Sequence, residues 1–359
     1  MKKFIDIHVP ITACNLRCHY CYVTQMCKSN TEKVEFKYSP QHVGKALSAK
    51  RLGGKCLINI CGLGETLIPK ELIAFIKVLL DQGHYVMIVT NGVLSERFNE
   101  IAELSPKLLS RLMFKFSFHF LELKRLSILD VFFKNVEKMR QAGCSFTVEI
   151  TPTDELEPYI DDIREICMSR LGALCHVTIP RKENHKAIPL LSSHTIDEFY
   201  KVWSVFDSEL LNFKYSIWGV KRKEFCHAGE WTALLDLGTG LMTPCYNIRG
   251  QKQNIFQDVD KPIIFYPVGS GCKMPHCYNG HAFLALGDIP SINTLHYGKL
   301  RDRVDTQGRH WLNEDMREFL NERLEYNNDD EYTICQRLGF NYKKYYLLME
   351  NIFEKAIKR

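Results

Sequence analysis

Short apolar runs alternate with longer amphipathic segments along the first 215 residues of this 359-residue chain. Six of the runs are rich in β-branched and aromatic residues, which predicts strands at residues 4–9, 56–60, 85–90, 113–119, 146–151 and 175–179. Strands that alternate with helices at this spacing form right-handed βαβ units. The pattern therefore predicts an α/β fold with a parallel sheet, in which ligands bind beyond the carboxyl ends of the strands.

Capping residues mark the helices between these strands. Ser39 and Pro40 predict a helix start, because serine caps the first turn and proline fits the first helical position. Glycines after the helical patterns, such as Gly83 and Gly143, are typical of helix ends. Further helices are predicted at residues 71–82, 96–104, 130–142, 158–170, 195–211, 313–324 and 342–358.

Three cysteines follow the first predicted strand with the spacing CxxxCxxC: Cys14, Cys18 and Cys21. Cysteine thiolates hold iron-sulfur clusters, and three of them can bind three irons of a 4Fe-4S cubane. The fourth iron is then open to a ligand that chelates through amine and carboxylate, as the methionine part of S-adenosylmethionine (SAM) can. A zinc site is the alternative, but His19 lies inside the short CxxC loop, where it is poorly placed to complete one.

This spacing, with the aromatic Tyr20 before the third cysteine, resembles the motif of the radical SAM superfamily. The resemblance implies a partial (β/α)6 TIM-like barrel with a 4Fe-4S cluster at Cys14, Cys18 and Cys21, and SAM as cofactor. It implies an enzyme that cleaves SAM to a 5'-deoxyadenosyl radical, which abstracts hydrogen from a substrate carbon. A flavodoxin or ferredoxin-type protein is the electron donor expected from the resemblance.

The segment after the second predicted strand resembles the glycine-rich GGEP segment of the superfamily, in which the backbone binds SAM. Leu63 stands where that segment has its first glycine, and Thr66 where it has proline. Glycine is expected there because a side chain would hold the ligand away from the backbone. The SAM-binding residues implied by the resemblance lie here and at later strand ends: Gly62, Gly64, Glu65, Thr90, Asn91, Ser117 and Arg181.

Arg181 is suited to pair with the carboxylate of SAM through two parallel hydrogen bonds. The candidate catalytic residues are His119, which could face cofactor or substrate, and Cys61, a conceivable hydrogen donor. Each also has a structural alternative: His119 could be a hydrogen-bonded histidine of the barrel, and Cys61 could be a buried inert thiol. Asn91 and Gly92 are also an ordinary turn pair.

Four further cysteines follow the predicted barrel: Cys226, Cys245, Cys272 and Cys277. The glycines between the first two predict a hairpin, and the segment resembles the twitch and SPASM domains that hold auxiliary 4Fe-4S clusters. Four cysteines fit the shorter twitch form with one cluster. A zinc ribbon is the alternative, because four thiolates suit either metal.

If all four thiolates bind one cluster, no iron is free to hold substrate, and we expect the cluster to accept an electron. These assignments divide the chain into a radical SAM barrel at 1–215, an auxiliary cluster domain at 220–290 and a helical extension at 291–359. We expect the extension to cover the barrel mouth or the cluster domain.

The composition narrows the classes of function. With 47 basic and 42 acidic residues, the net charge of +5 is too small and too scattered to indicate nucleic acid. No apolar stretch approaches a membrane span, and the apolar region near the N-terminus is too short for a signal peptide, so we expect a cytoplasmic protein.

The favoured function is oxidation of a small polar metabolite such as a sugar. One alternative is a peptide maturase that crosslinks or epimerises its substrate, against which the short segment before the first strand counts. Another is a non-catalytic iron-sulfur sensor or a zinc-binding regulator.

Overall fold

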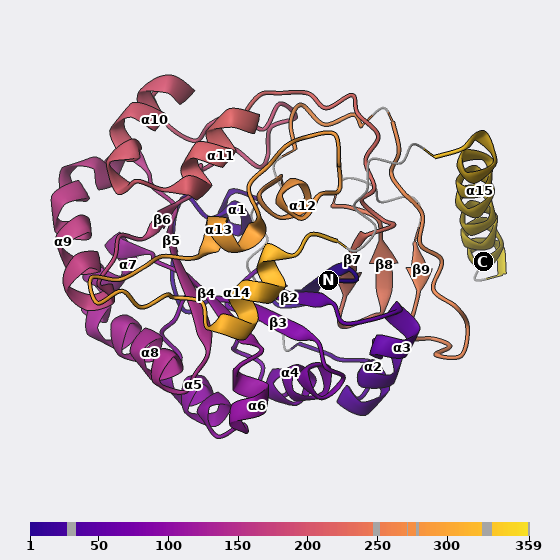
Figure 1. Cartoon of the computed structure of the whole chain (residues 1–359), viewed down its shortest axis with the longest axis horizontal. Coiled ribbons are helices and arrows are strands. Elements are labelled where there is room, and N and C mark those ends of the chain that lie inside the picture. The colour runs from indigo at the N-terminus through magenta and orange to yellow at the C-terminus, as the bar shows by residue number, and fades with distance from the viewer. Residues whose placement is uncertain (27–33, 247–251, 271, 278–279, 325–331, 358–359) are drawn as a thin grey trace.

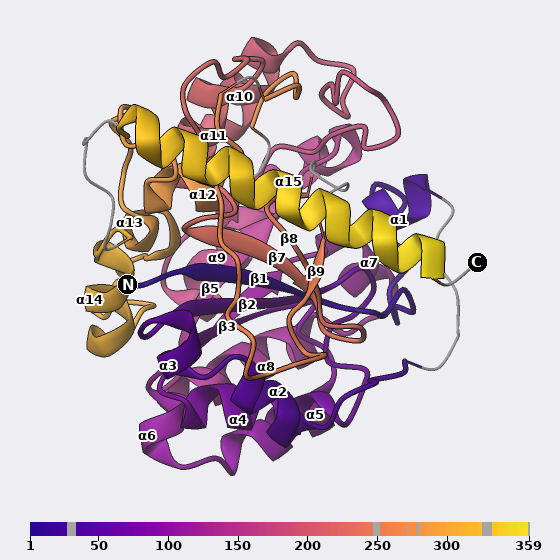
Figure 2. The same cartoon turned by 90° about the vertical axis from the view of Figure 1, so that its right-hand side faces the viewer.

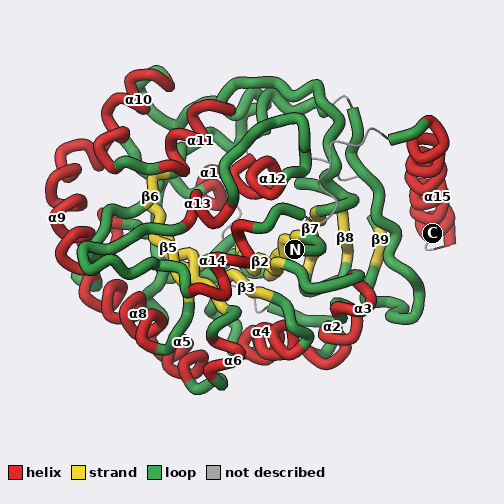
Figure 3. Tube along the Cα trace, viewed as in Figure 1, coloured by secondary structure: helices red, strands yellow, loops and turns green. Residues whose placement is uncertain are grey.

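A curved nine-stranded sheet forms the centre of the protein (Figures 1 and 3). The computed structural model describes residues 1–26, 34–246, 252–270, 272–277, 280–324 and 332–357. The strand order is β6-β5-β4-β3-β2-β1-β7-β8-β9, in which β1 to β7 are parallel and β8 and β9 antiparallel. The strands are β1 Phe4–Val9, β2 Leu57–Gly62, β3 Tyr85–Thr90, β4 Leu112–Ser117, β5 Ser145–Ile150, β6 His176–Val177, β7 Thr232–Asp236, β8 Leu241–Thr243 and β9 Gln253–Asn254.

Helices cover the outer face of the sheet, as Figure 3 shows in red around the yellow strands. Alternate strand residues such as Ile5, Ile7 and Val9 are buried in the apolar layer between strands and helices. The predicted α/β partial barrel is therefore confirmed. The helices up to residue 217 are α1 Tyr22–Gln25, α2 Pro40–Ala46, α3 Ala49–Leu52, α4 Leu72–Asp81, α5 Ser95–Ala102, α6 Pro106–Leu109, α7 Phe120–Arg125, α8 Leu129–Gln141, α9 Ile160–Leu171, α10 Ile196–Trp203 and α11 Glu209–Ile217.

Local capping chemistry explains where several helices begin. The Ser39 hydroxyl accepts a hydrogen bond from the backbone N–H of His42 at 3.2 Å, and Pro40 is the first residue of α2, as predicted. The prediction of one helix at 195–211 is wrong. Asp207 has φ +47°, which breaks the helical path, and the Ser208 hydroxyl caps the new helix α11.

Apolar residues close the amino-terminal end of the barrel. Phe4, Met87 and Met113, near the starts of their strands, belong to an apolar cluster with side chains of α12 Gly280–Leu286, α13 Tyr297–Arg301 and α14 Glu314–Asn321. Figure 1 shows these three helices lying across the inside of the curved sheet. They therefore cover the end opposite to the predicted mouth.

The segment after the barrel continues the same sheet. Strand β7 pairs in parallel with β1 along five residues, and β8 forms the predicted hairpin with β7. Helix α15 Ile334–Ile357 begins earlier than predicted and lies along the outside of β7 to β9 (Figure 2). The division at residues 215–220 stays a prediction, and the two parts share one sheet.

No helix among the described residues is long and apolar enough to cross a membrane.

The pH dependence of stability tests the packing of β6. Burial, followed by the charge of Arg303, lowers the pKa of His176 from 6.5 to about 3. Below pH 6.5 the unfolded chain binds a proton that the folded chain refuses, so stability should fall as pH falls, by about 1.4 kcal/mol per pH unit. Urea unfolding at several pH values should show that His176→Phe reduces the slope by about this amount, whereas the exposed control His185→Phe keeps it. An unchanged slope in His176→Phe would contradict the packing.

Candidate active site

A cavity of about 460 Å³ lies inside the barrel, within the usual range for a small-molecule site. Residues from β1 to β6 and from the loops after them form its wall. The structure thus brings together all the residues that the sequence predicted for the first cluster, for SAM and for catalysis: Cys14, Cys18, Cys21, Cys61, Gly62, Gly64, Glu65, Thr90, Asn91, Ser117, His119 and Arg181.

The first cysteine group lies in the loop between β1 and α1. Burial, together with the nearby thiols of Cys14 and Cys21, raises the pKa of Cys18 to about 12. A thiol with a raised pKa loses its proton when a metal ion binds to its sulfur. All three are described residues, and their sulfur atoms do not all lie within 4.8 Å of one another, as ligands of one ion would. Three cysteine thiols in one loop are the ligands that a 4Fe-4S cluster takes.

The glycine segment packs directly on the cysteine loop. The backbone N–H of Gly64 donates to the carbonyl of Ile11 at 2.8 Å, and that of Glu65 donates to the carbonyl of Ala13 at 2.9 Å. A Cβ atom on Gly64 would lie 1.9 Å from the carbonyl oxygen of Ala13. The glycine was expected from the approach of SAM, whereas contact between the two loops already requires it.

The Glu65 carboxylate joins the loops after β2 and β3. It is 2% exposed and accepts hydrogen bonds from the Thr90 hydroxyl at 2.6 Å and the backbone N–H of Asn91 at 2.7 Å. The Asn91 side chain then donates to Asn15 in the cysteine loop at 2.7 Å, and it lies 3.8 Å from the sulfur of Cys14. A hydrogen-bond path therefore runs from the glycine segment through β3 to the cluster cysteines.

The two candidate catalytic residues are both half-buried and line the cavity. Burial lowers the pKa of His119 to about 4, so the ring is neutral, and its Nδ1 lies 2.6 Å from the hydroxyl of Tyr20. His119 therefore fits the alternative of a hydrogen-bonded barrel histidine, which here positions the aromatic residue of the cysteine motif. Burial raises the pKa of Cys61 to about 12, which keeps this thiol protonated.

Arg181 and Ser117, which were also predicted to bind SAM, differ in their surroundings. The Nε of Arg181 lies 2.6 Å from the carboxylate of Glu183, so part of its charge is already balanced within the protein. Ser117 stands at the carboxyl end of β4 and lines the cavity.

Residues 8–165 match the family model of the radical SAM superfamily. This part of the chain is a radical SAM domain. The family uses a 4Fe-4S cluster and SAM, and the cysteine triad and the loops around it are the residues here that fit them. No curated protein sequence matches the chain.

Solved structures share the fold of this chain. SuiB of Streptococcus suis superposes with a TM-score of 0.51 at 15% identity, over 72% of this chain and 65% of SuiB. The enzyme titled anSMEcpe, solved with bound AdoMet, superposes with a TM-score of 0.50 at 13% identity, over 72% of this chain and 76% of that chain. The chain thus spans just under two thirds of the length of SuiB, and at these identities the likeness shows the fold alone.

The barrel also contains a layer of charged and polar residues that was not predicted from the sequence. We use "cavity floor" for the polar residues between the apolar end of the barrel and the cluster loops, namely Asp6, Asn59, Lys115, Glu149, Lys214 and Arg301. The first four occupy inward positions of strands, so the two-residue alternation could have revealed them. Lys214 and Arg301 come from α11 and α13, and no sequence pattern places them in the barrel.

The second cysteine group lies beside the radical SAM domain and outside the cavity wall. The backbone of Cys226 pairs with Gly269, three residues before Cys272. Burial, and then the nearby Asp288, Cys277 and Cys245, raise the pKa of Cys226. Tyr246, next to Cys245, lines the cavity and donates a hydrogen bond to Asp6.

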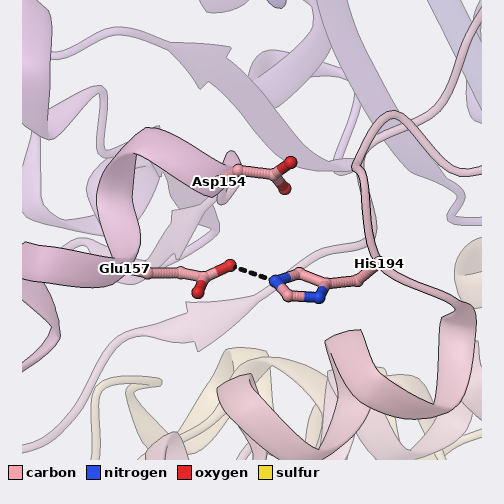
Figure 4. A group of neighbouring side chains, drawn as sticks. All are labelled: Asp154, Glu157 and His194. Carbon is pink, nitrogen blue, oxygen red and sulfur yellow. Dashed lines mark hydrogen bonds and ion pairs between the residues drawn. The ribbon is translucent and has the colours of Figure 1, made fainter.

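Another group of possible metal ligands, Asp154, Glu157 and His194, lies near the end of β5 (Figure 4). His194 is 2.6 Å from Glu157, and both oxygens of Asp154 accept hydrogen bonds from the 192–193 segment. These contacts fasten the loop before α10, and we assign no metal site to them.

Substitution of Gly64 tests the contact between the loops. Gly64→Ala should destabilise the protein by about 1–3 kcal/mol and reduce the iron retained after reconstitution, because the added methyl group overlaps Ala13. The matched control is Gly339→Ala in α15, where the added group meets nothing within 4 Å. Thermal unfolding and iron analysis measure both effects, and a Gly64→Ala protein that behaves like the control would refute the contact.

Proposed function

We propose that this protein is a radical SAM enzyme that oxidises a small polar molecule in the barrel cavity. The observation that carries the proposal is the meeting of the CxxxCxxC loop, the glycine segment and a lined cavity at one end of the sheet. A sensor or zinc regulator would not require such a cavity beside its metal. A chamber inside the barrel also favours a small molecule over a peptide as substrate.

Cys14, Cys18 and Cys21 would hold the first cluster. When bound and reduced, this group supplies the electron that cleaves SAM to the 5'-deoxyadenosyl radical, which takes a hydrogen atom from a substrate carbon. The chain itself positions the reactants and excludes water. In this role Tyr20 and His119 hold the cysteine loop, and Glu65 holds the loops against which SAM would lie.

SAM would occupy the part of the cavity next to the cysteine loop. The carboxyl ends of β2, β3 and β4 supply its expected contacts, through Gly62, Asn91 and Ser117. Arg181, whose Nε faces Glu183, would lie close enough to the cofactor end of the cavity to bind the carboxylate of SAM. The electron donor, a flavodoxin or ferredoxin, stays a prediction.

Cys226, Cys245, Cys272 and Cys277 would hold an auxiliary cluster. Four thiolates can complete the four irons of a cubane, and the nearby Cys245 and Cys277 contribute to the raised pKa of Cys226, so at least these three lie close together. Such a cluster supplies a one-electron acceptor, which suits a dehydrogenation. The contact between Tyr246 and Asp6 ties this segment to the cavity floor.

The first prediction of the proposal concerns the cysteine triad. Replacing Cys14, Cys18 and Cys21 by Ala should remove one cluster, about four irons per chain, and reduce 5'-deoxyadenosine formation to background. Anaerobic reconstitution, iron and sulfide analysis and a SAM cleavage assay with dithionite measure this. Cys335→Ala, which removes an exposed cysteine, is the control. Cleavage at the parent rate in the triple variant would refute the assignment.

The second prediction concerns the auxiliary group. Replacing its four cysteines by Ala should also remove about four irons per chain, while SAM cleavage stays detectable and substrate oxidation is lost. Metals that tie a segment together contribute to stability, so thermal unfolding of the variant must be measured alongside. Stoichiometric zinc in the anaerobically purified parent, with iron for one cluster, would refute the auxiliary cluster and leave a single-cluster enzyme.

A further inference from the structure

The cavity floor carries more positive than negative side chains. Lys115 and Arg301 share a single carboxylate, that of Glu149, which lies 3.0 Å from the Nζ of Lys115 and forms an ion pair with Arg301. Glu149 is 5% exposed and Arg301 is fully buried. Two cations therefore face one anion in a region with little water.

Arg301 has donors that nothing uses. Its Nε and Nη2 are buried and have no hydrogen-bond partner among the described residues. An unpaired buried donor is unfavourable, and for a charged group the penalty is larger. The guanidinium lines the cavity, so a ligand in the cavity can satisfy it.

Lys214 adds a third cation. Its Nζ donates to the hydroxyl of Thr178, and no carboxylate pairs with it within the part of the chain that the structure describes. The charge of Lys115 lowers the pKa of Lys214, and the charge of Arg301 lowers the pKa of Lys115. Each of these groups therefore lies within electrostatic range of the next.

The acidic groups nearby are already engaged. Asp6 accepts hydrogen bonds from Asn59 at 2.8 Å and from Tyr246. Glu65 accepts three hydrogen bonds in the loops above, and Glu183 lies against Arg181. Among the described residues, Glu149 is the one carboxylate paired with Arg301, and it is shared with Lys115, while no carboxylate is paired with Lys214.

We propose that Lys115, Lys214 and Arg301 bind an anionic group of the substrate, a carboxylate or a phosphate, on the cavity floor. An arginine and two lysines suit either anion, because the guanidinium offers parallel donors and each ammonium adds a point charge. That the bound molecule is the substrate rests on the proposed function. The anionic group then lies at the floor, and the remainder of the molecule extends toward the SAM end.

The protonation of the two lysines supports this site. Burial, and then the charge of Arg301, lower the pKa of Lys115 to about 7, while burial lowers the pKa of Lys214 well below its usual value. An anion beside them favours their charged forms. Binding should therefore take up protons and weaken as pH rises.

Anion binding to the anaerobically purified protein, without reductant, tests the proposal. Calorimetry and thermal unfolding would compare inorganic phosphate and malonate with chloride at equal ionic strength. We expect at least one of the two anions to bind and stabilise the protein, and the tighter one to identify the group. Lys214→Met and Arg301→Gln should each weaken this binding about tenfold or more, whereas the exposed control Lys107→Gln should not.

Stability separates a binding role from a structural one. Lys214→Met removes a desolvated amine that has no carboxylate partner among the described residues, so the anion-free variant should be as stable as the parent or more stable. Lys214→Gln repeats the test with a polar side chain, and failure of both variants to fold would assign Lys214 to the fold and overturn the proposal. Equal binding by parent, Lys214→Met and Arg301→Gln would overturn it, as would no binding beyond chloride.

These measurements do not depend on SAM cleavage. A protein that binds the anion through Lys214 and Arg301 but never cleaves SAM would retain the anion site and lose the proposed function. A protein that cleaves SAM but binds neither anion would retain the function and lose this site.

Discussion

The contact between the glycine segment and the cysteine loop is the constraint on which the rest of the site depends. Two backbone hydrogen bonds join these loops, and the absence of a side chain at Gly64 allows the approach. Glu65, the next residue, binds the turn after β3 with its buried carboxylate. Three strand ends are thereby held together before any cofactor binds, so the triad can receive a cluster in a loop that already has its shape.

The barrel interior changes from apolar to charged over two residues of β1 and of β4. Phe4 and Met113 belong to the apolar end, while Asp6 and Lys115, two positions later, belong to the cavity floor. Burial of charge is unfavourable unless the charges are paired, and an apolar filling would have been more stable. The charged layer is therefore better explained by what it binds than by a contribution to folding.

The sequence was sufficient to predict the features that depend on residues close together in the chain. Residues 4–9 and 85–90 were predicted as the strands that form, because burial on the helix-facing side makes their pattern strong. The cysteine motif and Glu65 could be placed because they follow strands directly. Lys214 and Arg301 could not, because their helices reach the barrel through long-range packing, and a lysine on an amphipathic helix ordinarily faces solvent. The break at Asp207 was missed for a similar reason, since only the backbone shows its φ.

The shared sheet gives the second cysteine group a fixed relation to the first. Strand β7 follows closely after Cys226 and pairs with β1, the strand that ends just before the CxxxCxxC loop. Tyr246, beside Cys245, then reaches Asp6 on that same strand. Hydrogen-bonded strands do not slide past one another without breaking their ladder, so the separation of the two groups cannot vary freely. This fixed relation argues against the second group being a loosely attached module.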